Sequence, residues 1–198
     1  SLEHKESAML SSKRFNPLLC VCACLLGALT GSTSAATTFL QTYQLDEHLL
    51  EKRGEYRYVY RMFFKLYDAA LFTTSEAQPE DVLNAQVPFH LGFHYLRTIE
   101  KSIILESADK MLLRNLSPSE RQAIADRVDQ INAAYTTVNE GDTSSLTFTP
   151  RTGTRLNING ETVATIPGDD FAQLYFQIWL GEKPISEAMK VALFNQDK

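Results

Sequence analysis

The chain has 198 residues, of which 44% are hydrophobic and 22% charged, a composition typical of one soluble globular domain. Its formal net charge is −5, and because residues 1–35 carry +1, the remainder carries −6. An acidic chain without a run of Lys and Arg argues against a nucleic-acid-binding surface and against a polybasic site for anionic lipid.

The N-terminal region has the pattern of a secretory signal peptide. Lys13 and Arg14 precede an apolar run over residues 17–29, and small residues follow over 31–36. The run is shorter than the ~20 residues that span a bilayer, which makes an uncleaved anchor the weaker alternative. We therefore predict a tag or upstream extension over residues 1–8, a cleaved signal peptide over 9–36 and an exported domain over 37–198.

The cysteines lie inside this apolar run, at positions 20, 22 and 24. Cleavage after Ala35 or Ala36 removes them, so the mature domain is expected to contain no disulfide, cysteine nucleophile or thiolate metal site. Lipoprotein cleavage before Cys24 would leave only a stub of the apolar region and is the weaker alternative.

The first half of the mature chain has the period-two pattern of β-strands. Residues 37–45 form the first predicted strand, and a polar stretch follows over 46–55. Aromatic side chains alternate over 56–72, which predicts a strand with a break or bend. A loop with a short helix is expected over 73–86, and the next strand over 87–97.

The middle of the chain changes to helical periodicity. Residues 98–116 have an apolar stripe, and the capping box Ser-Pro-Ser-Glu at 117–120 predicts the start of a second helix. A strand over 145–150 follows. Residues 155–166 predict a hairpin across Asn-Gly at 159–160, the favoured pair for a tight primed turn.

The C-terminal segment predicts two further helices. The first follows Asp169 and ends near Leu180, with Gly181 placed to adopt a left-handed conformation. Ser186 caps the last helix. The order of elements predicts an α+β fold in which helices pack on one face of a largely antiparallel sheet and leave a cleft between the two layers.

Several segments resemble the chalcone isomerase-like family, and in particular its exported bacterial members. Residues 157–171 read Asn-Ile-Asn-Gly-Glu-Thr-Val-Ala-Thr-Ile-Pro-Gly-Asp-Asp-Phe, and 178–186 read Ile-Trp-Leu-Gly-Glu-Lys-Pro-Ile-Ser. Residues 62–72 look like the family's core strand, and Asn-Leu-Ser-Pro at 115–118 lies between these segments. The resemblance covers residues 43–194. It implies an open-faced β-sandwich and favours a periplasmic location.

The resemblance also implies a ligand site. Plant enzymes of this fold close a chalcone ring to a flavanone, and relatives bind fatty acids. In both, an arginine before the core strand and a tyrosine at the start of the first long helix face the ligand. In this chain these positions correspond to Val59 and Lys101, and two further polar positions correspond to Ala108 and Ile178. The changes argue against the isomerase reaction, and we predict no catalytic residue.

Five residues are candidates for ligand binding. Arg57 and Arg61 flank the missing arginine on the same predicted strand face, and an arginine can hold a carboxylate through paired hydrogen bonds. Arg97 and Lys101 lie where a strand leads into a helix start, a region that favours anions. Tyr67 lies in the core strand, where its hydroxyl could orient a carbonyl. The competing interpretation is a set of solvated surface charges.

Other polar groups are better explained as structural. His90 and His94 lie in a strand, where four residues span ~13 Å, too far to share one metal ion. Asp169 and Asp170 lie at a helix N-terminus, where carboxylates accept backbone N–H groups. The tyrosines at 56, 58 and 60 either line a ligand groove or pack the sheet against helices. No metal or cofactor is predicted.

These patterns predict a non-catalytic protein that binds a small amphipathic ligand, a fatty acid or an aromatic acid, between sheet and helices. One alternative is an intramolecular lyase of the chalcone isomerase type that uses Arg57 or Arg61 with Tyr67. Another is an envelope protein-interaction module with a filled core. A cavity large enough for a drug-sized ligand would argue against this second alternative. The sequence leaves the ligand's identity and the oligomeric state open.

Overall fold

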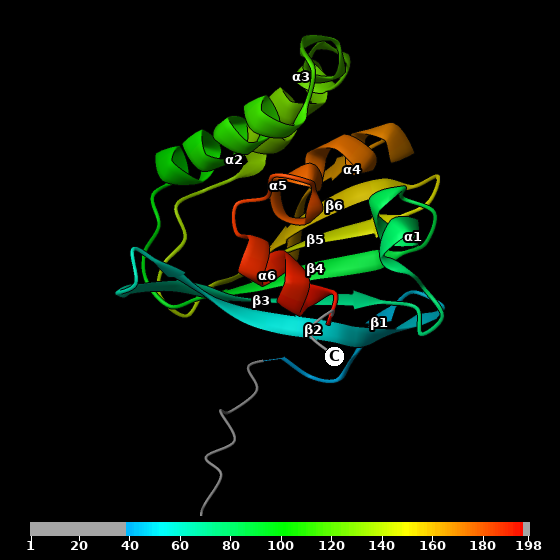
Figure 1. The fold of residues 1–198 in the computed structure, drawn as a ribbon, viewed down its shortest axis with the longest axis horizontal. Coiled ribbons are helices and arrows are strands. Elements are labelled where there is room, and N and C mark those ends of the chain that lie inside the picture. The colour runs from blue at the N-terminus through cyan, green and yellow to red at the C-terminus, as the bar shows by residue number, and fades with distance from the viewer. Residues whose placement is uncertain (1–38, 196–198) are drawn as a thin grey trace, which may run out of the picture. The chain divides into compact units, whose positions relative to one another are not determined.

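A seven-stranded antiparallel sheet organises residues 39–195, the part of the chain that the computed structural model describes (Figure 1). Each strand pairs with the next along the chain, so the sheet is a meander. The predicted extension and signal peptide lie outside the described residues. All of the described helices and strands fall within a single compact unit, residues 36–198.

The elements follow one another as strands, helices, strands and helices. The strands are β1 (Thr42–Leu45), β2 (His48–Tyr60), β3 (Phe64–Thr73), β4 (Phe89–Tyr95), β5 (Thr143–Thr149), β6 (Gly153–Ile158) and β7 (Glu161–Ile166). The helices are α1 (Pro79–Leu83), α2 (Lys101–Asn115), α3 (Pro118–Ala134), α4 (Asp169–Tyr175), α5 (Gln177–Leu180) and α6 (Glu187–Leu193).

The β2–β3 hairpin differs from the sequence prediction. The polar stretch 46–55 belongs largely to β2, because β1 and β3 supply hydrogen-bonding partners on both of its edges. The predicted bent strand 56–72 is two antiparallel strands, with Tyr60 opposite Phe64 and a turn at residues 61–63. Arg57 and Arg61 therefore do not share a strand face, since Arg61 lies in the turn.

Two local signals in the sequence are confirmed. Ser117 Oγ accepts a hydrogen bond from the Glu120 N–H at 3.3 Å, and Glu120 Oε2 accepts one from the Ser117 N–H at 2.7 Å. The β6–β7 turn has φ values of 51° at Asn159 and 84° at Gly160, as a primed turn requires.

The prediction of a left-handed Gly181 is wrong. Its φ is −71° and its ψ −170°, an extended conformation open to any residue. A Cβ at this position would collide with the Gln177 side chain and lie 2.9 Å from Asn115 Oδ1. Gly181 is therefore needed for close packing rather than for backbone freedom. The helix before it is also interrupted, because α4 ends before Phe176 and α5 begins after it.

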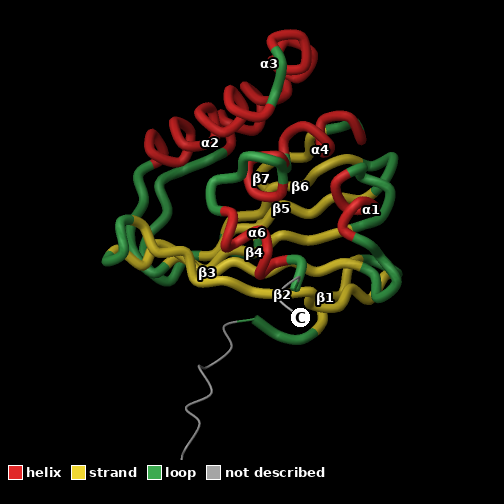
Figure 2. Tube along the Cα trace, viewed as in Figure 1, coloured by secondary structure: helices red, strands yellow, loops and turns green. Residues whose placement is uncertain are grey.

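The main core lies between the sheet and the helices. Figures 1 and 2 show the helices over one side of the sheet. Alternate residues of the central strands point to this side, and cross-strand neighbours such as Leu71, Leu91 and Leu146 are fully buried there. The predicted α+β fold, with helices on one face of a largely antiparallel sheet, is confirmed.

The other face of the sheet carries a second, smaller core. Leu45, Leu50 and Phe72 are buried there, and Tyr43 packs against them. The Tyr43 ring on β1 stacks on the His90 ring on β4, with centroids 3.7 Å apart. Three strand spacings of a flat sheet would separate these strands by ~14 Å. The contact therefore requires the sheet to curl toward this face.

Candidate functional site

A cavity of about 530 Å³ lies between the sheet and the helices. Its size falls within the range of pockets that hold drug-sized ligands, roughly 300–1,000 Å³. The sheet wall is formed by β2, β3 and β4, and the opposite wall by α2 and α5 with residues from the ends of α3, α4 and the following loop. The predicted cleft between the two layers is therefore present.

Aromatic rings form the sheet wall. Tyr58 and Tyr67 are cross-strand neighbours with ring centroids 5.1 Å apart. The Tyr67 ring also lies edge-on to Phe93 at 5.4 Å and to Tyr95 at 6.1 Å. Edge-to-face contacts at these distances are a favoured arrangement of aromatic rings. The wall therefore offers both ring surface and phenol hydroxyls to a ligand.

The helix wall is largely apolar. Trp179, the only tryptophan in the chain, lies 5.6 Å from the Phe93 ring and 5.9 Å from the Tyr175 ring. Ala108 of α2 and Ile178 of α5 also line the cavity. That these two positions correspond to polar residues of the family stays a prediction, and the structure shows that both apolar side chains line the cavity.

The buried tyrosine hydroxyls of the cavity, those of Tyr67, Tyr95, Tyr135 and Tyr175, remain protonated at neutral pH. Burial raises the pKa of Tyr67 well above its ordinary value and that of Tyr95 to about 12, and it also raises the pKa values of Tyr135 and Tyr175. Tyr95 shares a hydrogen bond of 2.8 Å with Ser144. The interior thus offers neutral hydrogen-bonding groups and no compensating positive charge.

The mouth of the cavity is more polar than its interior. Tyr60 and Ile103 are 45% and 51% exposed there. The Lys110 ammonium lies 2.7 Å from the Glu106 carboxylate, and both side chains are largely exposed. An ion pair this exposed contributes little to stability. Lys110 can therefore leave Glu106 and bind an anion at little cost in free energy.

Only one of the five predicted ligand-binding residues lines the cavity. Tyr67 does so, whereas Asp68, the next residue on β3, points to the opposite face. Arg57 lies across from Asp68 and donates to both of its carboxylate oxygens, from Nε at 2.6 Å and from an Nη at 2.8 Å. Arg57 and Tyr67 are therefore on different faces of the sheet.

The other three candidates lie around the end of the sheet next to the cavity. The Arg61 guanidinium lies over the Tyr60 ring at 5.2 Å, and that of Arg97 over the Phe64 ring at 5.1 Å. Lys101 Nζ donates to the Ala133 carbonyl at 3.1 Å, which ties the start of α2 to the end of α3. None of the three is among the cavity-lining residues. Their ligand-binding role remains a prediction.

Of the remaining polar groups, His90, Asp169 and Asp170 have structural partners, whereas the buried Nδ1 of His94 has no hydrogen-bond partner among the described residues. His90 Nδ1 lies 2.7 Å from Thr147 Oγ1. Asp170 accepts two hydrogen bonds from Arg127, at 2.9 and 2.6 Å, which lower its pKa. Asp169 accepts from the Arg151 N–H at 2.8 Å. Within residues 39–195 there is no cluster of three His, Cys, Asp or Glu side chains that could hold a metal ion.

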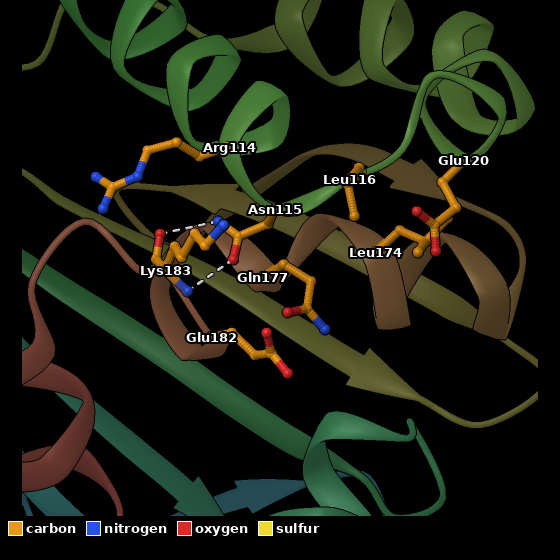
Figure 3. A pocket seen from close by; sticks show the side chains of 8 residues that line it. All are labelled: Arg114, Asn115, Leu116, Glu120, Leu174, Gln177, Glu182 and Lys183. Atoms are coloured by element: carbon orange, nitrogen blue, oxygen red, sulfur yellow. Dashed lines mark hydrogen bonds between the residues drawn. The ribbon is translucent and has the colours of Figure 1, made fainter.

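A second hollow of about 330 Å³ has a different character (Figure 3). Its lining is mostly charged or amide side chains, and Asn115 is its organising residue. Asn115 Oδ1 accepts from the Lys183 N–H at 2.8 Å, and Nδ2 donates to the Lys183 and Met111 carbonyls at 2.9 Å. These bonds fasten the end of α2 to the loop after α5, so Asn115 is a structural residue.

Sequence reasoning missed most of the cavity. The alternation at 56, 58 and 60 raised a ligand groove as one interpretation, and Tyr58 and Tyr60 do line the cavity. Tyr135, Tyr175 and Lys110 were not singled out. They lie on separate helical segments, and no local motif connects them before the chain folds.

Comparisons with known proteins agree with this architecture. The sequence model described as chalcone isomerase-like matches residues 32–195. Among solved structures, a fatty-acid-binding protein of Arabidopsis thaliana superposes with a TM-score of 0.59 at 10% identity, covering 80% of this chain and 91% of that protein. At this identity the likeness concerns the fold. No curated protein matched the sequence.

Proposed function

Because the chain belongs to the chalcone isomerase-like family, we propose that it is a non-catalytic binding protein for a small amphipathic ligand, a fatty acid or an aromatic acid. The observation that carries the proposal is the cavity of about 530 Å³ with aromatic and aliphatic walls. The Arabidopsis fatty-acid-binding protein, which has the same fold, supports the same ligand class.

The electrostatics of the cavity set the orientation of such a ligand. A buried carboxylate needs a cation or several charged hydrogen bonds, and the residues lining the interior supply only neutral donors such as Tyr67 and Tyr95. The apolar part of the ligand is therefore expected inside, against Trp179. The acid group is expected at the mouth, where Lys110 can approach it.

The two alternative functions have less support. An isomerase using Arg57 with Tyr67 needs both groups on one substrate, but they lie on opposite faces of the sheet. Arg61 lies in the β2–β3 turn rather than in the cavity wall. An interaction module with a filled core is disfavoured by the size of the cavity.

Trp179 provides a direct test. Its ring lines the cavity and is the only indole in the chain, so ligand entry should change its fluorescence. We would titrate residues 36–198 with oleate and with a cinnamic acid. Ala108→Phe fills the cavity and should abolish the response. The matched control is Leu113→Phe, an exposed position on the same helix, and it should leave the response intact.

A second comparison tests the orientation. Lys110→Met should weaken oleate binding and leave the binding of oleyl alcohol unchanged, because only the acid carries a charge. Two results would show that the cavity is not the binding site. One is that neither oleate nor the cinnamic acid changes Trp179 fluorescence in the wild-type protein, and the other is that Ala108→Phe binds the ligand as tightly as the wild type does.

We also propose that the protein is exported to the periplasm of a bacterium. The proposal is supported by the basic, apolar and small-residue pattern of residues 9–36. Fractionation of the native host followed by N-terminal sequencing tests it. A mature N-terminus near Ala36 in the periplasmic fraction is expected, and a full-length chain in the cytoplasm would contradict it.

A further inference from the structure

The tip of the β2–β3 hairpin exposes an unusual concentration of apolar side chains. Of the nine exposed large apolar residues among positions 39–195, four fall within five positions. They are Tyr60 at 45%, Met62 at 84%, Phe63 at 80% and Phe64 at 45% exposure. Single exposed apolar residues need no explanation, but such a cluster marks an interaction site.

The tip also projects from the sheet. Tyr67 is the last β3 residue paired with β4, so residues 59–65 pair only with each other. The hairpin lies at the end of the sheet where β4 leads toward α2, on the left in Figure 1. The tip therefore extends beyond the rest of the sheet. Its side chains can insert into a lipid or protein surface without unfolding the domain.

The turn keeps bulky residues where the backbone favours smaller ones. Arg61 and Met62 have φ values of 47° and 63°, and the Phe63 N–H donates to the Tyr60 carbonyl at 3.3 Å. Gly and Asn adopt such left-handed angles more readily. Strained residues of this kind are concentrated at functional sites, and here the turn exposes Met62 and Phe63.

Three cations surround the apolar tip. Arg61 is in the turn, Lys65 follows Phe64 on β3, and the Arg97 guanidinium lies 5.1 Å from the Phe64 ring centre. Within the part of the chain that the structure describes, none of the three forms an ion pair with a carboxylate. The sequence offers no basic run, because these charges come from three separate places. Folding thus brings three positive charges together at one place, although the net charge of the whole chain is negative.

The tip adjoins the mouth of the cavity. Tyr60, which precedes the turn, and Leu66 on β3 line the cavity together with Ile103 and Lys110 of α2. A surface that touched Met62 and Phe63 would therefore lie next to the opening through which a ligand enters.

We propose that the β2–β3 turn docks the protein on the surface of a lipid bilayer that contains anionic lipids. Met62 and Phe63 enter the interface between headgroups and acyl chains, and Arg61, Lys65 and Arg97 meet the lipid phosphates. Apolar side chains combined with cations are the features that bind proteins to such interfaces. Docking beside the cavity mouth would also let a ligand pass between the bilayer and the cavity. This last step rests on the proposed function.

Vesicle sedimentation tests the docking. The assay uses residues 36–198, which contain all the described elements, because the apolar run at 17–29 would itself enter lipid. The protein should sediment with vesicles of phosphatidylcholine and phosphatidylglycerol at 70:30, and much less with phosphatidylcholine alone. Met62→Ser/Phe63→Ser should weaken vesicle binding by about tenfold or more, because two apolar side chains lose their transfer into lipid.

The matched control is Leu49→Ser/Leu113→Ser, which removes two exposed apolar side chains away from the tip and should bind vesicles like the wild type. Circular dichroism would verify that both variants fold. Equal sedimentation of both variants, or no binding by the wild type, would overturn the proposal. A dimer that only Met62→Ser/Phe63→Ser dissociates, without vesicle binding, would identify a protein interface instead. Trp179 titration with oleate reads the cavity independently and should be unchanged in both variants.

Discussion

His90 should make the domain less stable in mild acid. Its side chain is 7% exposed, stacked on Tyr43 and hydrogen-bonded to Thr147. Burial, with a smaller contribution from Arg155, lowers the pKa of His90 from 6.5 to about 3. At pH 5 the unfolded state therefore binds a proton that the folded state does not, and stability contributed by the neutral ring is lost as the pH falls below about 6.5.

The size of this effect follows from the two pKa values. Between pH 7.5 and pH 5.0 the free energy of unfolding should fall by about 2 kcal/mol on account of His90 alone. Urea unfolding followed by Trp179 fluorescence at both pH values measures it. In His90→Gln this part of the pH dependence should disappear. The control His48→Gln removes an exposed histidine and should retain it.

The comparison between variants decides the outcome, because other groups titrate in the same range. If the wild type and His90→Gln lose the same free energy between pH 7.5 and pH 5.0, the buried histidine is not held neutral. That result would refute the close stacking of Tyr43 on β1 against His90 on β4.

Two further substitutions test how the helices are held. Gly54→Ala should destabilise the domain by about 1–3 kcal/mol, because the new Cβ collides with the Ala192 carbonyl at the end of α6; unchanged urea unfolding would refute this contact. Asn115→Ala should lower the free energy of unfolding by about 1–3 kcal/mol, because it removes both hydrogen bonds to Lys183. Asn115→Asp should keep only the bond that Asn115 Oδ1 accepts from the Lys183 N–H. Equal stability of the three proteins would show that the loop needs no such fastening.

Signals carried by neighbouring residues were predictable from the sequence. Ser117 and Glu120 are three positions apart, and Asn159 and Gly160 are adjacent, so the helix start and the primed turn follow from local chemistry. The pattern along residues 87–97 likewise predicted the strand β4. The α+β class followed from the order of such elements, and the family resemblance followed from particular segments such as residues 157–171.

Features that depend on contacts between distant segments were not predictable. The polar stretch 46–55 forms a strand because β1 and β3 complete its hydrogen bonds, and Gly181 must be a glycine because atoms of Gln177 and Asn115 lie where a Cβ would be. Local propensity carries no information on either contact.

The chain by itself determined that helices would cover one face of an antiparallel sheet. Only the tertiary structure decided which side chains meet. It set Tyr67 in a cavity with Tyr135 and Tyr175, and it paired Arg57 with Asp68 on the opposite face. The reason is physical: strand alternation fixes the face of each residue, but the curl of the sheet and the packing of the helices fix its neighbours.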